Sequence, residues 1–220
     1  MNSKSLKRSA KITGAFFILA TAASVAAALL ISPMLAAPDY LAAMAQNANT
    51  VVLAVVCMLV AVVAIIGIPV MLYPIIRMHS EVLALWFLST RLLEAVFYTL
   101  GIVCTLTLLA LAREGGSADT AVLVRLMSDV AFNMGTLIIF SLSAIILGIV
   151  LYRAKLVPRW LSIWAFIGGV LLFAQGILVL FGASTPTLEA TLFIPIALNE
   201  MVLAVWLLTK GFNMPDEVAA

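Results

Sequence analysis

Three charged residues interrupt apolar stretches of this sequence and are the first candidates for chemistry. Arg91 and Glu94 lie in the run "STRLLEAVFYTLG", and Glu200 lies in "LNEMVLAVW". A charged side chain at the centre of a bilayer costs at least about 2.5–3.5 kcal/mol. Such residues are retained where they pair with one another or handle a ligand, an ion or a proton. The charges of these three residues can offset one another only if their side chains lie close together.

Counting residues along the expected helices places all three at a similar depth. Arg91 lies ten positions after Glu81, which is roughly 15 Å at 1.5 Å per helical residue. Glu94 is about 5 Å deeper by the same rise. Glu200 lies ten positions before Lys210 on a helix running the other way, so it is again roughly 15 Å in. The count predicts one polar layer near mid-membrane.

Other polar residues accompany this layer. Asn199 is adjacent to Glu200, and Gln175 lies at a comparable level, about 22 Å from Trp160. Tyr98 follows Glu94 by four positions and so continues the helical face that Arg91 and Glu94 share. The predicted ligand-binding or proton-binding residues are Arg91, Glu94, Glu200, Asn199, Tyr98 and Gln175.

The expected arrangement is a triad, Glu94–Arg91–Glu200, because a guanidinium has five donors in a planar fork and can hold two carboxylates. With both acids ionised the triad has one negative charge too many. Either one carboxyl carries a proton or a cation completes the site, which fits a proton relay or a cationic or hydrogen-bonding ligand. Buried Arg–Glu links also serve only to fix helix register. A cavity reaching Glu200 would favour the first hypothesis, and a sealed triad the second.

The surrounding elements are those of a membrane protein. Only 10% of the 220 residues are charged and 65% are hydrophobic, whereas soluble domains carry about 25% charged residues. We predict an all-α fold with six transmembrane helices at about 12–35, 50–73, 81–112, 132–152, 160–182 and 190–209. These spans leave room only for short loops, so residues 1–220 are expected to form a single membrane domain. The first apolar run exceeds the 7–15 residues of a signal peptide core, which favours a retained helix.

Two features of the pattern leave alternatives open. The segment "AVLVRLMSDVAFN" before the fourth span could lie at the membrane interface or extend that helix outward. The third and sixth spans each carry a Glu near their middle, which hints at an inverted repeat of two three-helix halves. The halves otherwise do not match, so the repeat stays an open alternative.

Basic residues predict the orientation, because Lys and Arg concentrate in cytoplasmic loops. Arg113 and Arg125 alone belong to the side away from the termini. The terminal side carries Lys4, Lys7, Arg8, Lys11, Arg77, Arg153, Lys155, Arg159 and Lys210. Both termini are therefore expected in the cytoplasm. Most interfacial aromatic residues fall at the same end: Tyr73, Trp86, Tyr152, Trp160, Trp164 and Trp206.

Several classes of function are disfavoured. A net charge of +2 gives no indication of nucleic-acid binding. Cys57 and Cys104 lie in apolar runs without metal-ligand spacing, and His79 is the only histidine, so neither a metal nor another cofactor is expected. No recognisable catalytic set is present, which makes an enzyme the weaker hypothesis. The lipid bilayer is the expected partner, with a small molecule, lipid or ion as a further candidate, and the pattern does not determine an oligomeric state.

Several segments together resemble a family of bacterial integral membrane proteins, the domain of unknown function 4386 family. They are "RSAKITGAFFILA", "PDYLAAMAQN", "GIPVMLYPIIR", "LALWFLSTRLLEAVFYTLG", "LYRAKLVPRWLSIWAFIGG" and "LNEMVLAVWLLTKGFN", in this order. The resemblance implies a multi-pass protein of the bacterial cytoplasmic (inner) membrane and brings no activity with it. Its notable charged positions are Arg91, Glu94, Arg159 and Glu200.

The sequence thus predicts a multi-pass membrane protein that binds or translocates a small molecule, an ion or a proton at a buried Arg/Glu layer. The alternative is a structural or partner-binding membrane module whose buried charges only lock helix packing.

Overall fold

A computed structural model describes residues 3–213 of the chain and is built of helices, which confirms the predicted all-α class. The elements are α1 (Ser3–Leu35), α2 (Tyr40–Gln46), α3 (Ala48–Arg77), α4 (Glu81–Glu114), α5 (Ala118–Asn133), the π-helix η1 (Met134–Ile139), α6 (Phe140–Arg153), α7 (Arg159–Leu180) and α8 (Pro186–Thr209). Within the described residues, six helical stretches are long and apolar enough to cross a membrane, and α5, η1 and α6 form one of them.

Local sequence signals set the helix ends. The hydroxyls of Ser80, Ser117 and Thr185 accept hydrogen bonds from backbone N–H groups in the first turns of α4, α5 and α8, which otherwise have no partner. Gly115 ends α4 in the left-handed region, at φ 70°, where an L side chain would be strained. Gly116 N–H then returns to the carbonyl of Leu111.

The structure differs from the expected spans at three places. Helix α1 begins within the basic segment, and the polar connection after it contains the short helix α2, capped by Asp39. Helix α3 continues to Arg77, beyond the expected end of the second span at about residue 73. The segment "AVLVRLMSDVAFN" extends the fourth helix and is not a separate interfacial helix. The longer helices arise because hydrophobicity marks the part of a helix inside lipid, whereas backbone hydrogen bonding continues beyond it.

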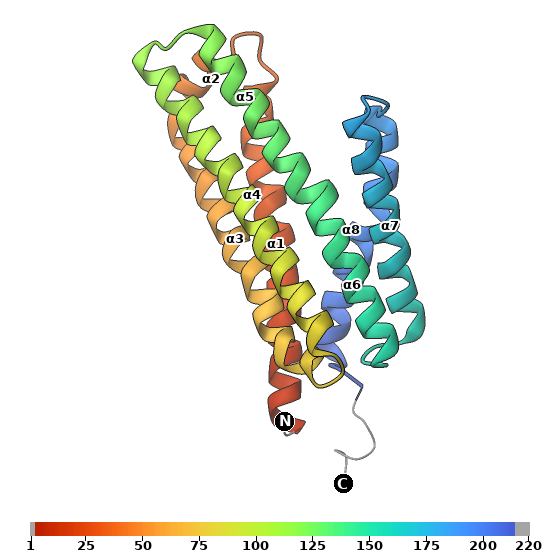
Figure 1. Ribbon diagram of the computed structural model, residues 1–220. Coiled ribbons are helices and arrows are strands. Elements are labelled where there is room, and N and C mark those ends of the chain that lie inside the picture. Colours follow the sequence, from red (N-terminus) through yellow and green to blue (C-terminus); the bar gives the residue numbers. More distant parts are fainter. Residues whose placement is uncertain (1–2, 214–220) are drawn as a thin grey trace.

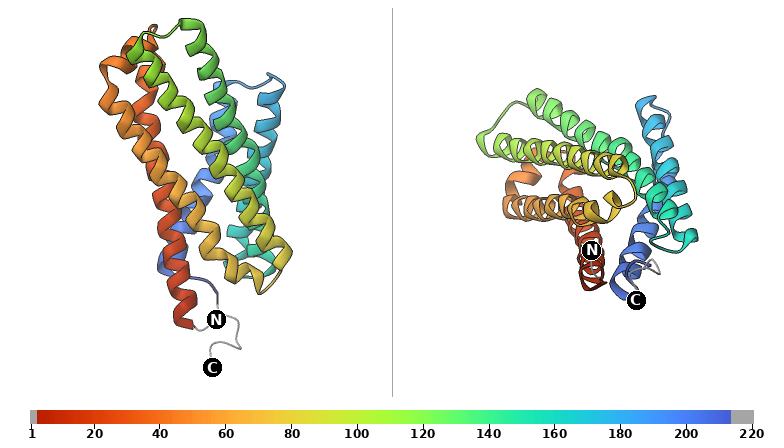
Figure 2. Two further views of the ribbon diagram at one scale, coloured as in Figure 1. Left: turned by 60° about the vertical axis from the view of Figure 1, so that its left-hand side comes forward. Right: turned by 60° about the horizontal axis from the view of Figure 1, so that its bottom comes forward.

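The helices form two groups joined by one long diagonal helix (Figures 1 and 2). α1, α3 and α4 pack together, and α6, α7 and α8 pack together. The continuous helix of α5, η1 and α6 lies on α4 along its first part and on α7 along its last part. α1 also contacts α8, so the two groups meet a second time.

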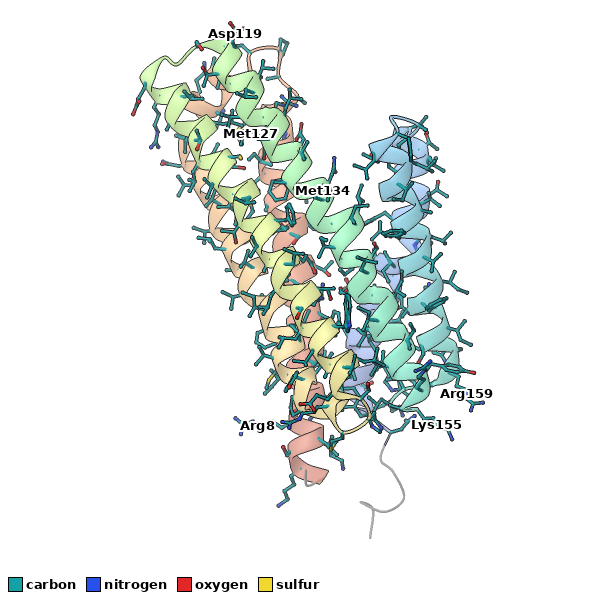
Figure 3. All side chains as sticks on the ribbon, viewed as in Figure 1. Arg8, Asp119, Met127, Met134, Lys155 and Arg159 are labelled. Carbon is teal, nitrogen blue, oxygen red and sulfur yellow. The ribbon has the colours of Figure 1, made fainter. Side chains whose placement is uncertain are left out.

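The described chain begins and ends at the same end of the bundle, which we call the terminal end (Figure 1). Arg8, Lys155 and Arg159 lie there, and Asp119 lies at the opposite end (Figure 3). Many large apolar side chains on the outward faces are exposed, including Leu29, Val63 and Val96. Helices of this kind place such side chains against the lipid of a bilayer.

The half of the bundle nearest the terminal end is densely packed. Its buried core brings together large side chains from α1, α3, α4, α6, α7 and α8, among them Phe17, Leu72, Phe87, Leu151 and Leu207. Two glycines allow close helix contacts there. A β-carbon at Gly14 would lie 2.7 Å from the Ala204 carbonyl oxygen, and one at Gly148 would lie 2.8 Å from the Phe166 backbone nitrogen. Small residues at helix contacts are typical of membrane bundles.

The contact of α6 with α7 gives a direct test. We expect Gly148→Val to lower the free energy of unfolding by about 1–3 kcal/mol, because the added atoms meet backbone and not a flexible side chain. Ala174→Val on the exposed face of α7 is the matched control and should change stability by less than about 0.5 kcal/mol. Unfolding in detergent micelles measures both. Equal stability of the two variants would contradict the close contact.

Candidate functional site

The predicted triad of charged side chains is present and bridges α4 and α8. Arg91 Nη1 donates a hydrogen bond to Glu94 Oε2 at 2.8 Å. Arg91 Nη2 lies 3.7 Å from Glu200 Oε1, within ion-pair range but beyond hydrogen-bond distance. Counting depth along the sequence therefore predicted the right three residues. The two carboxylates differ in their distance from Arg91.

Arg91 is the centre of this arrangement. Its guanidinium carbon lies 5.9 Å from the ring centroid of Phe17 on α1 and 5.2 Å from that of Phe140 on α6. Aromatic faces attract a guanidinium, so four helices converge on one cation. Its Nε is buried and finds no hydrogen-bond partner within residues 3–213. The cation is thus partly satisfied and retains donor capacity.

The two acids differ in exposure as well as in distance. The side chain of Glu94 is 9% exposed, whereas that of Glu200 is 19% exposed. Glu94 is three residues from Arg91 on the same helix, so the helix itself fixes their separation. Glu200 belongs to another helix and reaches Arg91 only through the tertiary fold. Glu200 is therefore the carboxylate with room to contact something else.

A cavity of about 470 Å³ reaches all three charged residues from the side away from the termini. Along α1 its lining runs from Phe17 to Leu35, and along α4 from Arg91 to Leu108, a length of about 25 Å at 1.5 Å per residue. This volume spread over that length makes a narrow tube that is partly open to the surroundings of the bundle. Its volume falls in the range of small-molecule sites, about 300–1,000 Å³.

Small side chains on α1 leave this space unfilled. Ala20, Ser24, Ala28 and Ser32 recur every four residues and line the tube. Positions four apart share a face of a helix, so these four residues form a stripe of small side chains along the cavity. In the terminal half, α1 instead contributes Phe17 to the core. The small residues of α1 thus border the hollow half, and Phe17 lies where the filled half begins.

The π-helix η1 shapes the facing wall. Phe132, Thr136 and Phe140 line the cavity at spacings of four residues. Such positions drift by about 40° per step around an α-helix of 3.6 residues per turn. A π-turn, with hydrogen bonds from i to i+5, is wider and offsets that drift. η1 therefore keeps the three side chains on one wall, beside Gly135, where α4 approaches closely.

A second polar cluster lies at the far end of the cavity. Arg125 Nη1 donates to the backbone carbonyl of Leu35 at 2.8 Å, and its guanidinium carbon lies 5.0 Å from the ring centroid of Tyr40. The last carbonyls of a helix have no intrahelical partner, so Arg125 satisfies the end of α1. Asp129 lines the same region.

A much smaller cavity of about 10 Å³ lies on the terminal side of the triad. Asn199, Arg91, Glu200 and Ser143 line it, together with Phe87 and Leu203. Asn199 Nδ2 also donates to the carbonyl of Leu161 at 3.1 Å, which joins α8 to α7. The loose Arg91–Glu200 pair therefore stands between the large cavity and the packed terminal half.

The remaining predicted residues divide into two groups. Tyr98 lines the large cavity, donates to Ser24 Oγ at 3.1 Å, and contacts the edge of Phe132. Gln175 is buried on α7 and, among the described residues, lines neither cavity, so its role as a ligand residue stays a prediction. Cys57 and Cys104 are free and half-buried.

Sequence reasoning missed several polar residues of the cavity wall, namely Thr21, Ser24, Ser32, Ser128 and Thr136. The signal for those on α1 was the recurrence of Ala, Ser and Thr every three or four residues in "ATAASVAAALLIS". Thr136 had no comparable signal, because the π-turn that directs it inward has no distinctive composition.

Removing Arg91 should expose the cost of two unpaired acids. We expect Arg91→Leu to lower the free energy of unfolding by about 3–5 kcal/mol. The triple variant Arg91→Leu, Glu94→Leu, Glu200→Leu should regain most of this loss, because it leaves no buried charge unpaired. Unfolding in detergent measures both variants. A single variant as stable as the wild type would show that the triad does not hold α4 to α8.

The unequal distances predict unequal effects of neutralising the two acids. Glu94→Gln loses the partner of the 2.8 Å hydrogen bond and should cost about 3 kcal/mol or more. Glu200→Gln leaves the neutral Arg91–Glu94 pair intact and should cost less than about 1 kcal/mol. Comparing the two isosteric variants in the same unfolding assay checks this order, which would be wrong if Glu200→Gln were the more damaging.

Comparison with known proteins gives a family and no activity. The family described as "Domain of unknown function (DUF4386)" matches residues 12–211, most of the chain. No curated protein and no solved structure matches the chain. The matched range includes all three residues of the triad and every residue that lines the cavity. This chain, a multi-pass membrane protein, therefore belongs to the DUF4386 family.

Proposed function

We propose that this protein binds a small molecule inside the membrane, in the large cavity, with Glu200 as the anchoring group. The observation that carries the proposal is that a cavity of about 470 Å³ ends on a charged triad at mid-bundle. A site built of apolar walls and a few convergent polar groups is the usual form of a small-molecule pocket. Glu200 is the one acid of the triad without a short hydrogen bond to Arg91.

The alternative is a structural module in which the triad only links α4 to α8. The tight Arg91–Glu94 pair and the hydrogen bond from Asn199 to α7 fit that role. A structural link alone, however, is served best by a sealed, fully paired cluster, because an under-paired charge is costly. A cavity against the looser acid favours binding, since it gives that acid a route to another partner.

We place both termini in the cytoplasm, since the terminal end carries most of the Lys and Arg residues. The cavity then extends from mid-membrane toward the outer side, and the packed half lies toward the cytoplasm. In this arrangement a molecule reaches Glu200 from the outer side or from the lipid. Translocation would further require the core around Phe87 and Leu151 to open.

Cysteine labelling tests access to the cavity. In a Cys57→Ser, Cys104→Ser background, Ala197→Cys on α8 lines the cavity, whereas Ala204→Cys lies on the same helix in the packed half. We expect a membrane-impermeant, trimethylammonium-bearing methanethiosulfonate to modify Ala197→Cys at least about tenfold faster, because a buried thiol reacts only after local opening.

The sidedness follows from the same variants. The reagent should modify Ala197→Cys when it is added to intact cells. The rate of modification should fall in inverted vesicles, where the reagent reaches only the cytoplasmic face. Equal rates at positions 197 and 204 would refute access to the cavity, and labelling only from the cytoplasmic face would refute the orientation.

A further inference from the structure

We propose that the ligand of the large cavity is an organic monocation with one apolar tail, such as a lipophilic amine. This inference rests on the proposed function and names the ligand class of that site. Three features carry it: the charge of the triad, the composition of the cavity walls and the shape of the tube.

The charge of the triad favours a cation. Glu94 and Glu200 face a single guanidinium, so the cluster holds one more acid than base. An ammonium group beside Glu200 would balance the charges and donate hydrogen bonds to the carboxylate, which lies 3.7 Å from Arg91. An anionic ligand would meet two carboxylates around Arg91, the only guanidinium at this end of the cavity among residues 3–213. Like charges placed together are unfavourable.

The walls suit an organic cation better than a metal ion. Phe17 and Phe140, which contact Arg91, line the inner end of the tube, and Phe193 lines it about two helical turns from Glu200. The faces of aromatic rings attract ammonium groups. Hard metal ions require six or more oxygen ligands at short range. A cavity of about 470 Å³ with largely apolar walls offers far more space than such an ion occupies and suits a molecule with a body of its own.

The shape fits a single tail. The tube continues from the triad past the small residues Ser24 and Ala28 of α1 toward the far end. There Arg125 and Asp129 carry opposite charges, so this end offers no net charge to a second ionic group. The ligand class is therefore a molecule with its charged group at Glu200 and an uncharged chain along α1.

The test compares three probes of equal chain length: octylamine, octanol and octanoate. Each is added to the Ala197→Cys protein in proteoliposomes at pH 7, and the rate of modification by neutral methyl methanethiosulfonate is measured. Val205→Cys, exposed on α8, corrects for partitioning of the probes into lipid. We expect octylamine to slow modification of position 197 at least about tenfold, and octanol and octanoate less than about twofold, at equal concentration.

A second variant connects the preference to Glu200. In the Glu200→Gln background, protection by octylamine should fall to the level of octanol, whereas Thr136→Val, which alters another polar residue of the wall, should retain the preference. Equal protection by all three probes, or strongest protection by octanoate, would overturn the cationic ligand while leaving a binding cavity in place. Absence of protection by every probe, at a position 197 that reacts freely, would overturn the proposed function itself.

Discussion

The fold depends on pairing a guanidinium that cannot lose its charge. An Arg side chain stays protonated, and a bilayer interior offers it no water. Arg91 therefore has to find carboxylates and aromatic faces inside the bundle, and those it finds come from α1, α4, α6 and α8. The requirement of one side chain thus sets which helices share the centre of the molecule.

The triad also divides the bundle into two halves with different side-chain packing. On its terminal side, large side chains and closely approaching glycines fill the space. On its other side, small residues of α1 face the diagonal helix of α5, η1 and α6 across a tube of about 470 Å³. Lipid supplies no hydrophobic force to close that tube, because apolar side chains gain little by leaving hydrocarbon for protein.

Glu94 and Glu200 lie in different environments, and this difference gives them different roles. Glu94 is bound to Arg91 through the geometry of one helix turn, and its role is explained by that local pair. Glu200 is held by the docking of α8 and faces the tube. One acid thus serves the pairing of Arg91, and the other is the group that a ligand would meet.

The sequence by itself determined the helical class, the number of apolar helices and the similar depth of Arg91, Glu94 and Glu200. These follow from residue type and from a fixed rise per residue, which are one-dimensional properties. Tertiary structure alone decided that Arg91–Glu200 is looser than Arg91–Glu94, that Gln175 lies away from the cavity, and that a tube exists at all. A cavity depends on which side chains face a stripe of small residues, and those come from other helices. A local π-turn depends on helix packing. Residue spacing along the sequence therefore predicts neither.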